Sequence, residues 1–174
     1  MYIHITGAAG SGTSTLAAAY ANATGVRVLE TDDYFWRPTE PPYQTKFEEA
    51  ERCANLLRDL RAGADAVVSG ALIGWGRALE DAFDLVVFLY VPTDIRLARL
   101  TLREESRFGK ADPGFLAWAA QYDAGTAEGR SLERHRAWLQ RRQCPVLCLE
   151  GEHSVEERLQ KLLAARRTIA EGNG

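Results

Sequence analysis

The chain has 174 residues, a length that suits one domain with a substantial hydrophobic core. Its apolar fraction of 46% and charged fraction of 26% are those of a folded globular protein and exclude a disordered chain. A formal net charge of −3 argues against a duplex nucleic-acid binder, which would carry a strongly basic face.

Two further classes of protein are disfavoured. No charged and then apolar leader follows Met1, and no apolar run is long enough to cross a bilayer, so we expect a cytoplasmic protein with no membrane partner. The cysteines, Cys53, Cys144 and Cys148, lack the spacing of a disulfide framework or a zinc site. The three histidines are scattered and form no metal-ligand pattern.

Strand and helix patterns alternate along the chain. Short apolar, β-branched runs predict strands over 2–6, 26–30, 66–68, 85–91 and 145–149. Helical spacing or composition predicts helices from about 12 to 21 and over 47–60, 77–83, 94–108, 115–122 and 131–141, with a last one beginning at 154. Pro38, Pro41 and Pro42 predict a loop over 37–43. This alternation is typical of a parallel α/β sheet with ligands at the carboxyl ends of its strands.

A glycine-rich segment joins the first strand to the first helix. Glycines allow the backbone to turn tightly and to direct successive N–H groups at an anion, and the helix dipole adds to this attraction. The spacing is that of the Walker A pattern, G-x-x-x-x-G-K-S/T, except that a threonine occupies the lysine position. The segment reads Gly7, Ala8, Ala9, Gly10, Ser11, Gly12, Thr13, Ser14, followed by Thr15.

These residues, 7 to 15, are the predicted binding site for the phosphates of ATP. Ser14 stands where a hydroxyl would hold Mg²⁺ between the outer phosphates. The missing lysine leaves the catalytic competence of the site open. Lys46, Arg103 and Arg107 are candidates for the replacing cation.

Four segments together resemble the P-loop kinases of the adenylate kinase-like group. Residues 31–36 are similar to the D-D-x-F segment of uridine and nicotinamide-riboside kinases. Residues 84–92, followed by an arginine-rich helix, and residues 145–151 match later parts of the same pattern. The resemblance implies a three-layer P-loop fold with a five-stranded parallel sheet flanked by helices. It further implies one kinase-like domain over 1–174, with a lid around 104–130.

In the kinases that the chain resembles, a carboxylate after the second strand helps to remove the proton of the acceptor hydroxyl. Asp33 is the first candidate for this role and Asp32 the second; the alternative is that both residues only end the strand and start a turn. The aromatic residues that follow could stack on a planar acceptor, with Trp75 as a partner, or could belong to the core. Ser69 occupies the place where relatives often carry an acidic residue.

Arginines recur at helical spacing after the fourth strand. Arg96, Arg99, Arg103 and Arg107 fall on one stripe of the expected helix, and Ile95, Ala98 and Leu102 on the other side are expected to face the core. The resemblance implies that Arg103 and Arg107 belong to a lid and act on the transferring group. The alternative is a solvated face paired with neighbouring glutamates.

Three functions remain in order of support. The first is an ATP-dependent phosphotransferase that acts on a small nucleoside, nucleotide or metabolite. The second is a nucleotide-binding sensor without turnover, which the threonine at position 13 favours. The third is a sulfuryl transferase, because residues 11–14 resemble the turn of sulfotransferases, although these normally carry a lysine just before it.

Overall fold

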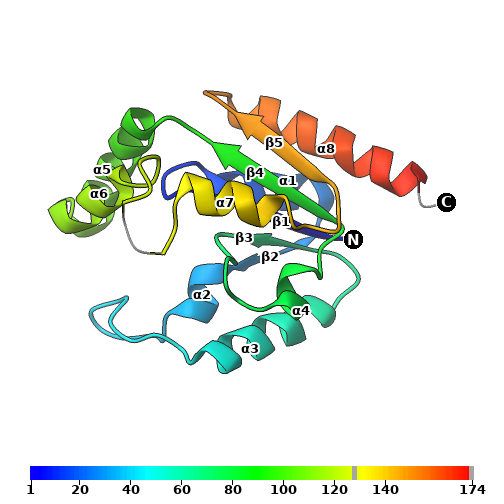
Figure 1. The fold of residues 1–174 in the computed structure, drawn as a ribbon, viewed down its shortest axis with the longest axis horizontal. Helices are drawn as coiled ribbons and strands as arrows, with labels where there is room; N and C mark the ends of the chain where they lie inside the picture. Colours follow the sequence, from blue (N-terminus) through cyan, green and yellow to red (C-terminus); the bar gives the residue numbers. More distant parts are fainter. Residues whose placement is uncertain (127–128, 173–174) are drawn as a thin grey trace.

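The computed structural model describes residues 1–126 and 129–172. Its centre is a parallel sheet of five strands in the order β2-β3-β1-β4-β5 (Figure 1). All four strand pairings are parallel, which confirms the predicted fold class. The strands are β1 (Tyr2–Gly7), β2 (Arg27–Glu30), β3 (Ala66–Ser69), β4 (Leu85–Tyr90) and β5 (Val146–Glu150).

Helices cover both faces of the sheet and make three layers. On one face, α1 and α8 bury Leu16, Tyr20 and Leu162 against strand residues that include Ile3 and Val87. The helices of this face are α1 (Thr13–Thr24) and α8 (Val155–Gly172). The opposite face carries α3 (Glu49–Arg61), α4 (Arg77–Glu80) and α7 (Leu132–Leu139).

The second face has its own core. Leu56 and Leu60 of α3 and Trp138 of α7 pack against Val86 and Phe88 of β4, and all five side chains are buried. Because β4 is covered on both faces, its sequence is continuously apolar and does not alternate. The side chains of β4 therefore belong to both cores and hold the sheet between the two helical layers.

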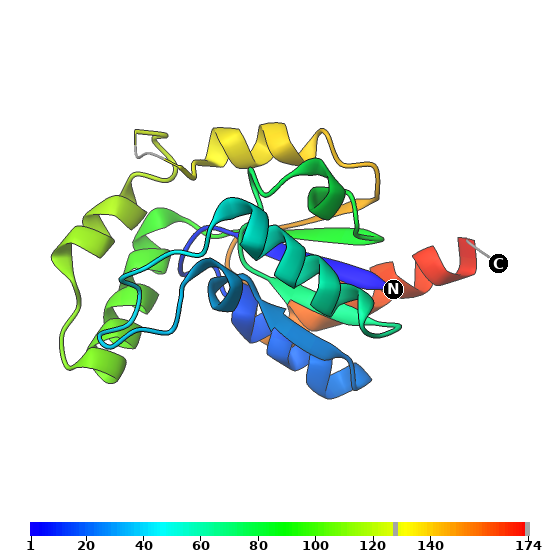
Figure 2. The same cartoon turned by 90° about the horizontal axis from the view of Figure 1, so that it is seen from below.

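Two helices lie apart from these layers. Helices α5 (Thr93–Phe108) and α6 (Pro113–Ala120) pack against each other beyond the carboxyl end of β4, whereas the start of β1 and the end of α8 lie at the opposite end of the molecule (Figures 1 and 2). Asp112 caps α6 by accepting a hydrogen bond from Gly114 N at 2.8 Å. None of the helices that the described residues form could bridge the apolar core of a bilayer.

One element differs in kind from the prediction. Instead of a turn, the polar residues after β2 begin a short helix, α2 (Thr31–Phe35), which Trp36 N closes with a hydrogen bond to Asp32 O at 3.0 Å. The carboxylates of Asp32 and Asp33 lie in its first turn, where the helix dipole favours negative charge. Five residues are too few for a helical period, so the sequence pattern could not indicate this helix.

Candidate functional site

The glycine-rich loop leaves β1 and enters α1 through a tight turn. Ser11 N donates to Ala8 O at 3.1 Å, and Gly10 and Gly12 have φ angles of 81° and 95°. A Cβ atom on Gly10 would lie 2.7 Å from Arg96 O, so this position requires glycine. Helix α1 then begins at Thr13 without a side-chain cap, which leaves its first amides available to an anion.

Three side chains from different strands and helices meet beside this loop. The hydroxyl of Ser14 donates to Glu30 Oε2 at 3.0 Å, and the hydroxyl of Ser69 donates to Ser14 Oγ at 3.4 Å. Burial raises the pKa of Glu30, while the hydroxyls of Ser14 and Ser69 act in the opposite direction. Hydroxyl and carboxylate oxygens are the ligands that Mg²⁺ prefers, so this donor set fits the ion implied by the sequence.

Glu30 was not among the functional residues predicted from the sequence. It was predicted only as the end of a strand, although the carboxyl ends of parallel strands converge on the ligand edge. Applied to the last residue of the second predicted strand, this rule would have identified Glu30 from the sequence. Ser69, by contrast, lies where the sequence placed it, at the end of β3.

Both predicted carboxylates of α2 are exposed, but they have different neighbours. The pKa of Arg130 is lowered by burial and raised by the charge of Asp32. Asp33 instead acts on Tyr34, whose hydroxyl donates to Asp59 Oδ2 at 3.0 Å. The charges of Asp32 and Asp33 both raise the pKa of Glu30, and of the two only Asp32 acts on Arg130.

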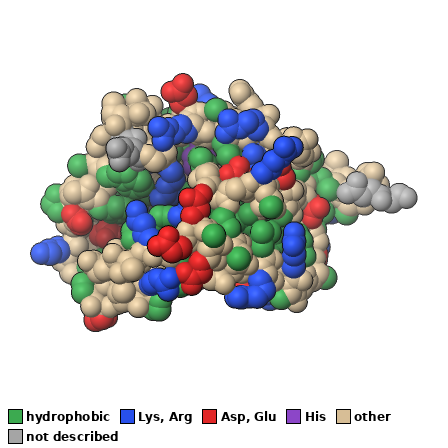
Figure 3. Space-filling view, turned by 60° about the horizontal axis from the view of Figure 1, so that its bottom comes forward, with side chains coloured by type: hydrophobic (Ala, Val, Ile, Leu, Met, Phe, Trp, Pro, Cys, Tyr) green, Lys and Arg blue, Asp and Glu red, His purple; other side chains and the backbone are tan. Residues whose placement is uncertain are grey.

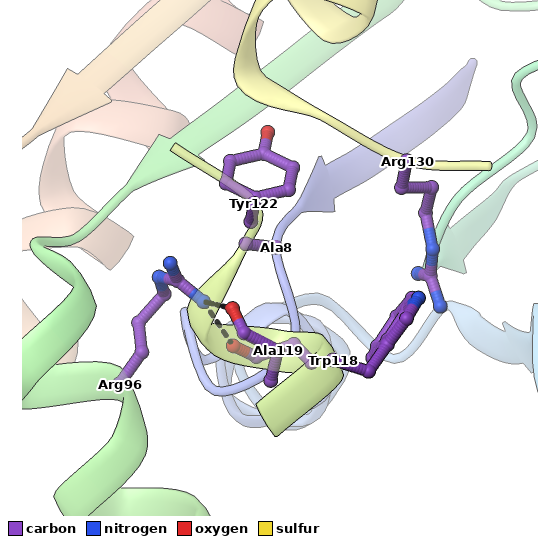
Figure 4. Close-up of a pocket in the computed structure, with 7 residues that line it drawn as sticks. Ala8, Arg96, Trp118, Ala119, Tyr122 and Arg130 are labelled. Carbon is purple, nitrogen blue, oxygen red and sulfur yellow. Dashed lines mark hydrogen bonds between the residues drawn. The ribbon is translucent and has the colours of Figure 1, made fainter. Parts of the chain in front are cut away.

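A cleft opens between the loop and α6 (Figure 4). Arg130, which the sequence analysis did not single out, enters it from the segment before α7 and lies over the ring of Trp118 at 5.3 Å. Figure 3 shows a hollow at this end of the molecule with basic and acidic side chains around it. The cleft is lined by Ala8, Ala9, Arg96, Trp118, Ala119, Tyr122 and Arg130.

The prediction of which face of α5 is buried was wrong. Arg96 and Leu100 are fully buried, whereas Leu102 is 69% exposed and Ala98 is exposed. Of the four arginines of the stripe, Arg96 alone is buried, because its guanidinium finds acceptors for its donors. Its hydrogen bonds go to Val91 O (3.0 Å), Ala9 O (3.3 Å), Ala119 O (3.2 Å) and Thr93 Oγ1 (2.8 Å).

The structure does not bring the three candidate cations to the phosphate loop. Arg103 is exposed and pairs with Glu104 at 3.0 Å, and Arg107 is exposed beside the ring of Phe108. Lys46 lies over the rings of Phe35 and Trp36. Within the described part of the chain, no hydrogen bond or ion pair joins any of the three to residues 7–15.

The aromatic residues at α2 form a stacked group with the predicted partner. Phe35 stacks on the buried Trp75 with ring centroids 6.2 Å apart, and Trp36 meets Phe35 edge-on at 4.9 Å. Arg52 of α3 lies over both Phe35 (5.1 Å) and Trp75 (4.8 Å). A cationic and aromatic surface thus flanks the two carboxylates.

Two buried histidines form hydrogen bonds with residues next to the site. His135 accepts or donates on both ring nitrogens, to Thr6 Oγ1 at 3.1 Å and to the hydroxyl of Tyr122 at 2.7 Å. His4 contacts Gly70 O through Nε2 at 2.9 Å. Burial lowers the pKa of His4 to about 4 and that of His135 to about 3, so both rings are neutral near pH 7.

This burial predicts acid destabilisation. Both pKa values lie below the unfolded value of about 6.5, so the unfolded chain binds more protons below that pH and the free energy of unfolding falls. Between pH 7 and pH 5 we expect a loss of about 2 kcal/mol for each histidine, measured by urea unfolding. His135→Gln should flatten this pH dependence, whereas His153→Gln, at a half-buried position just before α8, should not. An unchanged slope in the His135 variant would contradict the assignment.

Two known proteins are similar in sequence to most of this chain. The uncharacterized protein YqaC of Bacillus subtilis is 42% identical over 171 residues, which cover 92% of this chain and 94% of YqaC. A cytidylate kinase of Haloarcula marismortui is 34% identical over 122 residues, 64% of this chain and 62% of that enzyme. No model of a known protein family matches the sequence.

Solved structures share the fold at low identity. A gluconokinase from Sinorhizobium meliloti 1021 superposes with a TM-score of 0.61 at 20% identity, over 98% of this chain and 94% of that one. A deoxyadenosine kinase from M. mycoides gives a TM-score of 0.62 at 13% identity, over 96% and 100%. The chain therefore belongs to the same family as YqaC, and its fold is that of the P-loop kinases.

Proposed function

We propose that the protein is an ATP-dependent phosphotransferase that acts on a small acceptor. The observation that carries this proposal is the meeting, at one edge of the sheet, of the glycine-rich loop, the Ser14–Glu30 pair and the carboxylates of α2. The similarity to a cytidylate kinase over 122 residues supports the same class of reaction.

Each part has a distinct role in this proposal. The amides of residues 10–15 bind the phosphates, and Ser14 with Glu30 would hold Mg²⁺, which when bound neutralises charge on the outer phosphates. Asp32 accepts the proton that the acceptor hydroxyl loses as the phosphoryl group arrives. The charges of Asp32 and Asp33 both act on Glu30, and we place Asp32 before Asp33 because its charge acts in addition on Arg130, which lines the cleft beside the loop.

The acceptor is expected to be small and to carry negative charge. The charge of Asp32 acts on Arg130, and Arg52 of α3 lies over the rings of Phe35 and Trp75. Guanidinium groups of this kind recognise carboxylate or phosphate through paired hydrogen bonds. The stacked rings of Phe35 and Trp75 would supply an apolar wall.

We further propose that the chain acts as one kinase-like unit whose lid includes α6. The predicted lid, 104–130, contains residues 127 and 128, which lie outside the described residues. Helix α6 borders the cleft through Trp118 and Ala119. Arg103 and Arg107 would reach the transferring group only if the end of α5 moved toward the loop.

ATP with Mg²⁺ is expected to stabilise the fold. At a ligand concentration a hundred times the Kd, the gain in unfolding free energy is about 2.7 kcal/mol. Thermal unfolding with and without ATP and Mg²⁺ measures it, and adenosine, which lacks the phosphates, serves as the control. If no nucleoside triphosphate raises the melting temperature at millimolar concentration, the phosphate site is wrong.

A nucleotide sensor is the second candidate, because Thr13 stands at the position where the Walker A pattern has its lysine. Turnover separates it from the enzyme. A protein that binds ATP tightly but neither hydrolyses it nor transfers its phosphoryl group to any of a panel of hydroxy acids, nucleosides and nucleotides would be a sensor. Sulfuryl transfer has less support, since Ala9 and Gly10 stand where sulfotransferases carry their lysine.

A further inference from the structure

A buried arginine from the far end of the chain contacts the phosphate loop. Arg158, in the first turn of α8, is only 3% exposed. Its Nη1 donates to Ser11 O at 2.8 Å, and its Nη2 donates to Gly151 O at 3.1 Å. A Cβ atom on Gly12 would lie 3.3 Å from the same Nη1, so the guanidinium lies directly against the loop.

The charge of Arg158 has no counterion among residues 1–126 and 129–172. No carboxylate there forms an ion pair with it, and its Nε is buried without a hydrogen-bond partner. Burial and the nearby positive charge of Arg99 both lower the pKa of Arg158. Burying a charge without a counterion lowers the stability of the fold. An anion bound on the loop would lie near this charge and reduce that unfavourable free energy.

The contact also acts through the peptide group. Ser11 C=O and Gly12 N–H belong to one peptide, so donation from Arg158 to the oxygen polarises the N–H and strengthens it as a donor. Arg96 does the same from α5, because it donates to Ala9 O, whose peptide carries Gly10 N–H. The two arginines differ in charge balance: Arg96 lies 3.6 Å from a carboxylate oxygen of Asp123, and Arg158 has no such partner.

We propose that Arg158 is a positioning residue that supplies, from beneath the phosphate loop, the positive charge that Thr13 cannot. The ligand class is a polyphosphate anion, bound on the amides that Arg158 polarises. The inference rests on the proposed nucleotide site. It assigns the missing cation to α8 in place of Lys46, Arg103 or Arg107.

The test compares three substitutions by titration calorimetry with ATP and with inorganic tripolyphosphate. Arg158→Gln is expected to weaken the binding of both by tenfold or more, about 1.4 kcal/mol per factor of ten. Arg167→Gln removes the same charge from an exposed position of the same helix and should leave both affinities unchanged. Adding Thr13→Lys to Arg158→Gln should restore most of the affinity, which a purely structural role of Arg158 would not allow.

The outcomes separate this inference from the proposed function. If the native protein binds tripolyphosphate but no nucleotide, the proposed function fails, and the Arg158 variants still decide the inference. Unchanged affinity in Arg158→Gln, or no recovery with Thr13→Lys, would overturn it, as would native protein that binds neither probe. Should Arg158→Gln not fold, Arg158→Lys carries the test: it keeps the charge but cannot donate to both carbonyls, and three- to tenfold weaker binding is expected. Native affinity in that variant would contradict the proposal.

Discussion

Gly10→Val is expected to abolish measurable ATP binding, with a loss of affinity of more than a hundredfold. Gly10 has a φ of 81°, and its Cβ would lie 2.7 Å from Arg96 O and 3.0 Å from Leu100 Cγ. A β-branched residue is strongly disfavoured at this φ, and a buried carbonyl cannot yield as a flexible side chain does. The loop must therefore move, and its amides lose the arrangement that binds phosphate.

The matched control is Gly25→Val. Gly25 ends α1 with a φ of 74°, but a Cβ atom there would have no neighbour within 4 Å. Both variants carry backbone strain, of the order of 1–3 kcal/mol, and only the first carries the clash. Titration with ATP should thus distinguish them even if thermal unfolding shows similar losses. Equal ATP affinity in the two variants would argue against the loop as the phosphate site.

Asp32→Asn is expected to slow phosphoryl transfer by about a hundredfold or more and to leave ATP affinity unchanged. The amide cannot accept the acceptor's proton, and loss of a general base has effects of this size. The side chain is exposed, and no hydrogen bond fixes it among the described residues, so the fold should tolerate the change. Single-turnover kinetics with saturating ATP measures the step directly.

Asp33→Asn is the natural comparison, since it makes the same change one residue along the same short helix. Its charge acts on Tyr34 and Glu30 but, unlike that of Asp32, not on Arg130, so we expect a reduction of less than fivefold, well below that of Asp32→Asn. The reverse order would restore Asp33, the first candidate from the sequence. If both variants keep full activity, a carboxylate of α2 is not the base, and Glu30 becomes the next group to examine.

The fold could be predicted from the sequence because each layer leaves a local signature. The run from Leu85 to Tyr90 is continuously apolar because helices cover both of its faces, and this pattern located the central strand. The glycine-rich segment likewise located the phosphate loop, since its spacing and the flanking strand and helix are all local features. Both depend on neighbours within about ten residues.

The side chains around the loop could not be predicted in the same way. Helical periodicity assumes that apolar residues face the core, yet Arg96 is buried and Leu102 is exposed, because backbone carbonyls of the loop and of α6 satisfy the guanidinium. Glu30 meets Ser14 only through the order of the strands. Arg158 reaches Ser11 across 147 positions of the sequence, and no spacing rule extends that far.

Arg96 also ties three segments into one cooperative unit. Its guanidinium donates to the phosphate loop at Ala9, to the end of β4 at Val91 and to α6 at Ala119. If α6 swings outward, Nη1 of the buried Arg96 loses Ala119 O, one of its two acceptors, and keeps the other, Ala9 O of the loop. The free energy needed to move α6 away therefore includes the loss of a hydrogen bond from a buried charge, on the same nitrogen that contacts the glycine-rich loop.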